Sequence, residues 1–143
     1  LVTGKWKGED RDVDAALVKS RLASGERYIE VDDEDGKPAH SRFSPKAKYR
    51  DCSLMEVQIF SGRTHQIRVH ALALGHPIAG DDKYGEREVN GPLRKRGLKR
   101  MFLHSHFLGL PATESFPRLL LDAPLPPELR TFLDVLARGE RRA

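Results

Sequence analysis

The feature that most constrains the fold is a strand pattern of nine residues, from Cys52 to Phe60. Side chains alternate along it, and one of its two faces is wholly apolar, formed by Met55, Val57 and Ile59. Successive side chains of a β-strand point to opposite sides of a sheet. This segment therefore predicts a strand that packs its apolar face on a hydrophobic core.

A turn and a predicted helix follow this strand directly. Ser61-Gly62 breaks the strand, and we expect a helix from about His65 to Gly75, because Pro77 cannot continue it. At 3.6 residues per turn, one face of this helix should pack on the sheet, formed by Ile67, Ala71 and Leu74. The predicted local unit is a core strand that turns sharply into a helix.

The start of this helix carries polar side chains suited to a polyanion: Arg63, His65, Gln66, Arg68 and His70. Helix N-termini present free N–H groups and partial positive charge, and arginines make bidentate contacts with phosphate or carboxylate. Arg68 faces away from the apolar side, so we expect it half-buried at a cleft and paired with a carboxylate. Gln66 has an alternative role, in which it only caps or pairs with the backbone.

The remaining segments predict an α+β domain with a mixed, largely antiparallel sheet and flanking helices. Strands are expected over 1–6, 27–31, 37–43, 47–50, 100–110 and 118–121, and helices over 86–97 and 126–136. Residues 32–36 should form the turn of a hairpin between 27–31 and 37–43. Residues 7–12 suggest a polar loop, and 13–23 suggest either a short helix or an irregular excursion.

Positive charge is concentrated in the middle of the chain. Residues 61–106 carry nine basic and four acidic groups and five of the six histidines. A local basic surplus is what a polyanion-binding face requires. Phosphate contacts are expected from Arg94, Lys95 and Arg96, and such binding weakens with salt. The alternative is that these residues only solvate a helix face.

Membrane, redox and metal classes are disfavoured by what the sequence lacks. No stretch approaches the roughly 20 apolar residues that span a bilayer, and the first residues do not resemble a signal peptide. The one cysteine, Cys52, is expected in the core, and a reducing, cytoplasmic setting fits best. No metal is expected, since the histidines match no ligand set such as HExxH. His70 is expected to be a packed core histidine, and Asp81 to brace the neighbouring motif.

The segment Gly62-Arg-Thr-His-Gln-Ile-Arg-Val-His70 resembles the signature of the RluA family of RNA pseudouridine synthases. The match continues through Gly75-His-Pro-Ile-Ala-Gly-Asp81 and Tyr84-Gly85, and Leu1–Trp6 and Arg100–His104 agree with flanking family segments. Asp81–Glu88 and Ser24–Arg27 resemble the RluC branch, which acts on large-subunit ribosomal RNA. The resemblance covers nearly the whole chain and implies the pseudouridine synthase catalytic fold.

What the resemblance implies is isomerisation of uridine to pseudouridine in ribosomal RNA. In this family an aspartate attacks the uridine, the glycosidic bond from N1 breaks, and the ring rejoins through C5, without cofactor or metal. The target base is flipped into a pocket. By resemblance, Arg68 pairs with the catalytic aspartate and Leu103 lines the base pocket. RNA contacts are expected from Arg63, His65 and Gln66, together with Arg94, Lys95 and Arg96.

The family's nucleophile belongs to an Arg-Leu-Asp motif well before the signature, and this chain does not contain that motif. Arg21-Leu22 is followed by Ala23, and Arg118-Leu119 by Leu120. The family's active-site tyrosine would lie just upstream of Leu1. We therefore expect residues 1–143 to be the C-terminal portion of a single catalytic domain, inactive by itself. The alternative is a non-catalytic RNA-binding module with the same fold.

Overall fold

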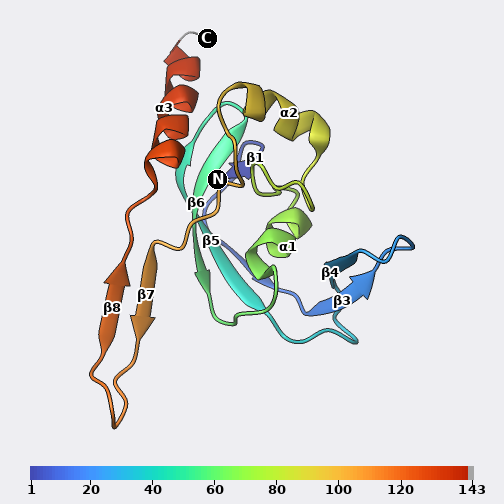
Figure 1. Cartoon of the computed structure of the whole chain (residues 1–143), viewed down its shortest axis with the longest axis vertical. Helices are drawn as coiled ribbons and strands as arrows, with labels where there is room; N and C mark the ends of the chain where they lie inside the picture. Colours follow the sequence, from blue (N-terminus) through green and yellow to red (C-terminus); the bar gives the residue numbers. More distant parts are fainter. Residues whose placement is uncertain (142–143) are drawn as a thin grey trace.

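A four-stranded antiparallel sheet forms the centre of the computed structural model, which describes residues 1–141 (Figure 1). Its strand order is β1-β6-β5-β2, with β1 at Val2–Thr3, β2 at Arg11–Asp14, β5 at His40–Lys48 and β6 at Cys52–Ile59. β5 and β6 form a long hairpin whose register shifts between Pro45 and Ala47. A proline cannot donate to the ladder, so an irregularity at this position is expected.

The prediction of a strand ending near Phe60 is confirmed, and so is most of its core face. Met55 and Val57 pack against a buried cluster that contains Phe43 and Ala71. Ile59 is different, because it lies at the end of the strand and is 49% exposed. The alternating pattern identified the face, but it could not show how far along the strand the core extends.

Two smaller hairpins extend from this sheet. One is formed by β3 (Leu17–Arg21) and β4 (Arg27–Val31), and the other by β7 (Phe107–Leu110) and β8 (Leu119–Asp122). Every strand pair within the described residues 1–141 is antiparallel. The α+β prediction with a largely antiparallel sheet is therefore confirmed, and no parallel pair occurs in that part of the chain.

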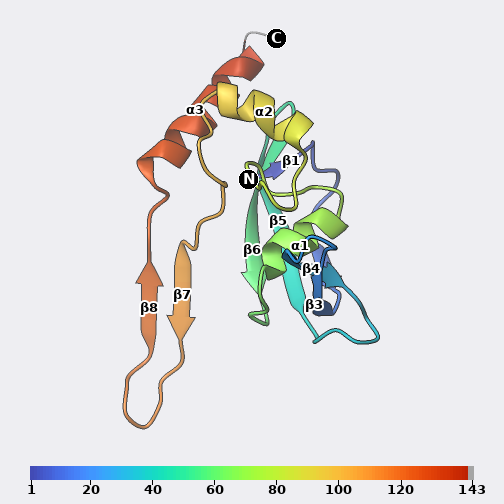
Figure 2. The same cartoon turned by 45° about the vertical axis from the view of Figure 1, so that its right-hand side comes forward.

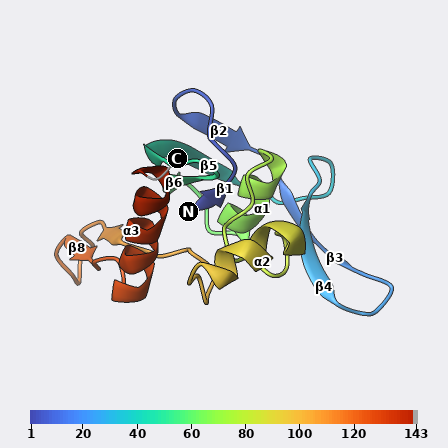
Figure 3. The same cartoon turned by 90° about the horizontal axis from the view of Figure 1, so that it is seen from above.

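The described residues form three helices: α1 at Gln66–Ala73, α2 at Arg87–Lys95 and α3 at Pro127–Arg141. α1 lies across one face of the sheet, as Figures 2 and 3 show, and its Ile67, Ala71 and Leu74 join the cluster beneath it. α2 and α3 enclose a second cluster with Cys52 and Phe102. No helix within the described residues is long and apolar enough to cross a membrane.

The expectations for residues 7–23 were wrong in part, because paired strands replace the predicted loop and helix. Val13 of β2 is buried in the hydrophobic cluster beneath α1. Leu17 of β3 is buried in a separate cluster. Their helix-like spacing therefore arises from two different strands. β2 has a single apolar residue, and its pairing with β5 includes an Asp12–Arg42 ion pair that only the fold brings together.

The predicted hairpin between 27–31 and 37–43 was also wrong, since β4 pairs with β3 instead. Residues 32–36 do form a turn, with the Asp32 carboxylate accepting from two backbone N–H groups. The chain then crosses to the other sheet, where β5 runs through the predicted separate strand at 47–50 to Lys48. Residues 101–106 have no regular secondary structure, so only Phe107–Leu110 of the predicted strand forms.

Candidate functional site

Arg68 and Asp81 form the only ion pair of the described residues that has a completely buried partner. Arg68 Nε donates to Asp81 Oδ2 and Arg68 Nη2 donates to Asp81 Oδ1, both over 2.8 Å. The Asp81 side chain is 0% exposed and that of Arg68 is 18% exposed. Arg68 is half-buried and paired with a carboxylate, as its position predicted, but the expected partner was the catalytic aspartate outside this chain, and the carboxylate that Arg68 contacts is Asp81.

The loop after α1 surrounds the Asp81 carboxylate with hydrogen-bond donors. Its Oδ1 also accepts from the backbone N–H groups of Lys83 and Tyr84, over 3.0 and 3.1 Å. Burial alone would raise the pKa of Asp81, but the Arg68 guanidinium and these two N–H donors hold that pKa below its ordinary value. Asp81 is therefore a fixed anion that orients the Arg68 guanidinium.

The loop is held in place from α2. Asn90 Nδ2 donates to the Asp81 carbonyl over 3.0 Å, and Asn90 Oδ1 accepts from the Gly80 N–H over 2.9 Å. Gly80 has a φ of +80°, and a Cβ there would lie 2.6 Å from the Arg100 carbonyl oxygen. Only glycine fits that position. The backbone conformation at Gly80-Asp81 is thus determined by close backbone packing as well as by the ion pair.

Gln66 lies inside the fold and uses its whole carboxamide there. Its Oε1 accepts from the Ser61 hydroxyl and the Arg63 N–H, while its Nε2 donates to the His40 carbonyl and the Ser41 hydroxyl. With two acceptor and two donor contacts, the amide has no capacity left. The 4% exposed side chain supports the structural alternative for Gln66 and leaves no free group for RNA.

His70 completes this network on the core side. Its Nε2 lies 2.8 Å from the Ala15 carbonyl, which can only accept, so Nε2 carries the proton and Nδ1 accepts from Ser41. Burial lowers the pKa of His70, which keeps this neutral tautomer. The prediction of a packed core histidine is confirmed. The network connects α1 to β5 and to the residues before β3.

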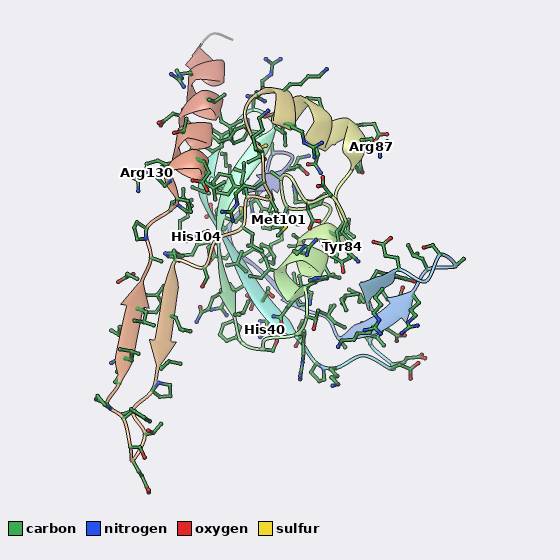
Figure 4. All side chains as sticks on the ribbon, viewed as in Figure 1. His40, Tyr84, Arg87, Met101, His104 and Arg130 are labelled. Atoms are coloured by element: carbon green, nitrogen blue, oxygen red, sulfur yellow. The ribbon has the colours of Figure 1, made fainter. Side chains whose placement is uncertain are left out.

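His65 and Tyr84 connect α1 to the β3–β4 hairpin. His65 adopts a left-handed backbone with φ of 53°, which is uncommon for a residue with a side chain. Its Nδ1 lies 2.7 Å from the Tyr84 hydroxyl, which also accepts from the Ile29 N–H. The Tyr84 ring lies 5.0 Å from the Arg68 Cζ. Figure 4 shows Tyr84 between α1 and that hairpin.

The remaining predicted contact residues divide into two groups. Leu103 is half-buried and packs against the cluster under α1, with its carbonyl accepting from Arg100. Arg63 is exposed and donates through Nε to the Pro38 carbonyl over 2.9 Å. Leu103 therefore lies on the core side of α1, and Arg63 lies at the surface in the loop that precedes α1.

The predicted basic contacts on α2 are mostly engaged by acidic neighbours. Arg94 pairs with Asp82 over 3.1 Å, and Arg96 pairs with Asp51 over 3.1 Å. Within residues 1–141, the side chains of Lys95 and Arg87 make no ion pair or hydrogen bond, and Figure 4 shows Arg87 at the outer end of α2. Exposed pairs of this kind are weak, so Arg94 and Arg96 can exchange them for phosphate oxygens.

The site shows no metal-binding arrangement within the described part of the chain, where no three His, Cys, Asp or Glu side chains converge. A cleft of about 230 Å³ is lined by Arg50, Asp51, Arg96, Leu136 and Gly139. It lies between α3 and the β5–β6 turn, away from the Arg68–Asp81 pair.

Asp81 was expected to brace the motif, and its spacing of 13 residues from Arg68 gave no sign of direct pairing.

Comparison with known proteins gives one consistent family. A sequence profile described as RNA pseudouridylate synthase matches residues 8–73. Ribosomal large subunit pseudouridine synthase C of Haemophilus ducreyi is 41% identical over 141 residues, 99% of this chain and 43% of that protein. Its Escherichia coli counterpart is 40% identical over 138 residues, 95% of this chain and 43% of that protein. The chain therefore spans less than half the length of these relatives.

Solved structures agree on the fold. Human RNA Pseudouridylate Synthase Domain Containing 1 has a TM-score of 0.72 at 24% identity, over 99% of this chain and 63% of the human chain. Domain Containing 4 has a TM-score of 0.71 at 26% identity, over 95% of this chain and 59% of the human chain. In sequence and in fold, this chain is homologous to the RNA pseudouridylate synthases.

Proposed function

We propose that this chain is the C-terminal portion of a catalytic domain that isomerises uridine to pseudouridine in large-subunit ribosomal RNA. The observation that carries the proposal is the oriented Arg68 at the start of α1, within a motif that resembles the family signature. The relatives named ribosomal large subunit pseudouridine synthase C support the substrate class. The nucleophilic aspartate would come from the part of the domain that lies upstream.

Arg68 has donors left for that aspartate. A guanidinium carries five N–H groups, and Asp81 takes one from Nε and one from Nη2. The Nη1 group and the second N–H of Nη2 remain, on a side chain that is 18% exposed. Arg68 would then hold two carboxylates, with Asp81 fixing its plane and the nucleophile accepting at its outer edge. This replaces the expectation that Arg68 has no carboxylate within the chain.

RNA would be held by the exposed basic groups near this site. Arg63 lies in the loop just before α1, and Arg87 and Lys95 lie on α2. Contacts from such residues to phosphate position RNA without reading its sequence, and they weaken steeply with salt. His65 is tied to Tyr84, so its expected RNA contact would use only the ring edge away from that hydroxyl.

The test compares two proteins, the 143-residue chain and a polypeptide extended upstream from Leu1 to the length of the curated relatives. We call the second the extended protein. Tritium release from 5-tritiated uridine in large-subunit ribosomal RNA reports pseudouridine formation. We expect release by the extended protein and none by the 143-residue chain. Release by the chain alone, or none by a folded extended protein that binds the RNA, would overturn the proposal; the latter result would favour a non-catalytic RNA-binding module.

A further inference from the structure

Tyr84 lies where the Arg68–Asp81 pair, the start of α1 and the β3–β4 hairpin meet. The Arg68 guanidinium lies over its ring, with Cζ 5.0 Å from the ring centroid. The Tyr84 hydroxyl contacts His65 Nδ1 and the Ile29 N–H. One side chain outside the Gly62–His70 motif therefore contacts two polar side chains within it.

The backbone around Tyr84 is held closely in place. Its N–H donates to Asp81 Oδ1 over 3.1 Å, and the Gly85 N–H donates to the Asp81 carbonyl over 3.0 Å. A Cβ at Gly85 would lie 2.5 Å from that carbonyl oxygen and 2.8 Å from Asn90 Nδ2, so the loop has no room to shift there. The Tyr84 side chain also packs against a buried cluster, formed by Leu17, Ile29, Ala39 and Val69. Its ring is therefore a fixed surface for the side chains around it.

Asp81 and Tyr84 constrain the Arg68 guanidinium in two different ways. The hydrogen bonds to Asp81 fix one edge of the guanidinium, but they still allow it to tilt about that edge. The guanidinium carbon lies over the face of the Tyr84 ring, and the attraction of a cation to an aromatic face limits this tilt. Arg68 is only 18% exposed, so little water screens the contact. Together the two neighbours determine where the remaining N–H groups of Arg68 point.

The Tyr84 hydroxyl determines which nitrogen of His65 carries the proton. The Ile29 N–H can only donate, so it takes the acceptor side of the hydroxyl, and the hydroxyl proton is donated to His65 Nδ1 over 2.7 Å. Burial and the neighbouring cations Arg68 and Lys83 lower the pKa of His65, so its imidazole stays neutral. The single ring proton is then on Nε2. Within the described residues Nε2 has no hydrogen-bond partner, so it is a donor available to a ligand.

We propose that Tyr84 is a positioning residue for the isomerisation, which holds two donors of the motif ready for the substrate. Its ring orients the Arg68 guanidinium toward the nucleophilic aspartate, and its hydroxyl keeps His65 in the tautomer whose Nε2–H donates to an acceptor oxygen of the RNA. This rests on the proposed function, which places the aspartate and the RNA at this site. The left-handed backbone of His65, with φ of 53°, supports the proposal, because such strain persists where the surroundings over-determine a functional position.

Two replacements at position 84 separate the ring from the hydroxyl. Tyr84→Phe keeps the ring and removes the hydroxyl. Trifluorophenylalanine at the same position keeps the ring shape but withdraws electron density from its face, which weakens the attraction to a cation. The same two replacements of Tyr28 on β4 are the matched controls. Within the described chain, Tyr28 has no hydrogen bond or cation–π contact with Arg68 or His65.

The extended protein reports the effect on the reaction through kcat and KM for ribosomal RNA. We expect Tyr84→Phe to keep kcat and to raise KM roughly threefold to tenfold, as loss of one oriented hydrogen-bond donor does. Trifluorophenylalanine at position 84 should have the same KM as Tyr84→Phe but a kcat roughly threefold to tenfold lower, because the hold on Arg68 is weaker. Both replacements at position 28 should leave kcat and KM unchanged. A purely structural role would give equal kcat for the two position-84 variants where both are folded, and that result would overturn the proposal.

Nuclear magnetic resonance of the 143-residue chain tests the same two contacts without activity. The ring-nitrogen shifts of His65 should show the proton on Nε2 in the unmodified chain and a mixture of tautomers in Tyr84→Phe. Hydrogen exchange of the Arg68 Nε–H should be faster with trifluorophenylalanine than with phenylalanine at position 84. A proton on His65 Nδ1 in the unmodified chain, or equal Arg68 exchange in the two variants, would overturn the proposal. An extended protein that binds RNA but makes no pseudouridine would overturn the proposed function, and these two measurements would still decide whether Tyr84 holds both donors.

Discussion

Arg68 and Asp81 face each other side-on, with two N–H···O contacts of 2.8 Å between a guanidinium at the start of α1 and a buried carboxylate in the following loop. The pair fixes the plane of the guanidinium and leaves its outer N–H groups unoccupied by Asp81. Because the Asp81 side chain is fully buried, the Arg68 guanidinium balances its charge in place of water. The stability of this corner and its proposed chemistry therefore depend on the same contact.

Replacing Arg68 should destabilise the fold strongly. Arg68→Ala leaves a buried carboxylate without its cation, which typically costs about 3–5 kcal/mol in the free energy of unfolding. Arg42→Ala is the matched control, since Arg42 makes a similar two-contact pair with Asp12 at the surface. We expect a much smaller change there, because exposed pairs are screened. Urea unfolding of both variants would contradict this account if the two losses were equal.

The same pair sets a dependence on pH. The pKa of Asp81 in the folded chain lies below its ordinary value of 3.8. Its contribution to stability is therefore complete above about pH 5 and is lost as pH falls through the folded pKa. In Arg68→Ala, burial dominates and raises the pKa, so the variant should gain stability as Asp81 takes up a proton.

The measurement is the difference in unfolding free energy between the two proteins, from pH 7 down to pH 3. We expect this difference to shrink steadily on acidification. A constant difference over the whole range would mean that the Asp81 charge plays no part in the pairing.

Gln66 should matter for stability and not for RNA binding. Gln66→Leu keeps the side-chain volume but removes four hydrogen bonds and leaves buried partners unsatisfied, at a cost of about 1–3 kcal/mol. Gln58→Leu on the exposed part of β6 is the control and should be nearly neutral. Unfolding curves would measure the stability, and fluorescence anisotropy with a ribosomal RNA fragment would measure binding at a temperature where both variants are folded. A loss of RNA affinity in folded Gln66→Leu would show a direct contact instead.

Tyr84 should hold the β3–β4 hairpin against α1 through one hydroxyl. Tyr84→Phe keeps the ring but removes the contacts to His65 Nδ1 and the Ile29 N–H. We expect a loss of about 0.5–1.5 kcal/mol and faster hydrogen exchange at Ile29. Tyr28→Phe on the same hairpin serves as the control, and unchanged exchange at Ile29 in Tyr84→Phe would contradict this role.

The sequence predicted those elements whose patterns are local. The alternation in β6, the apolar stripe of α1 and the prolines before α3 each determine their own segment. β2 and β3 could not be predicted in this way, because Val13 and Leu17 become strand residues only through pairing with β5 and β4. Tertiary pairing overrides a weak local pattern.

The site was predicted to a similar extent. Arg68 stood out through its position on the helix and its need for a carboxylate, and His70 through its place beside the apolar stripe. Asp81 was expected only to brace the motif, since contact across 13 residues depends on how the Gly80 turn packs under Arg100. The role of Gln66 depends on donors from Ser61 and Arg63 and on acceptors in the distant segment His40–Ser41, whose approach no spacing along the chain can show.

The most direct test of the central claim is pseudouridine formation by the extended protein carrying Arg68→Lys, compared with Arg42→Lys. Lysine keeps the charge but cannot contact Asp81 and a second carboxylate in one plane. We predict that Arg68→Lys slows tritium release roughly a hundredfold or more, as loss of a positioned donor does, while folding and RNA affinity persist. Arg42→Lys should retain the unmodified rate. Full activity of the Arg68→Lys protein would contradict the account.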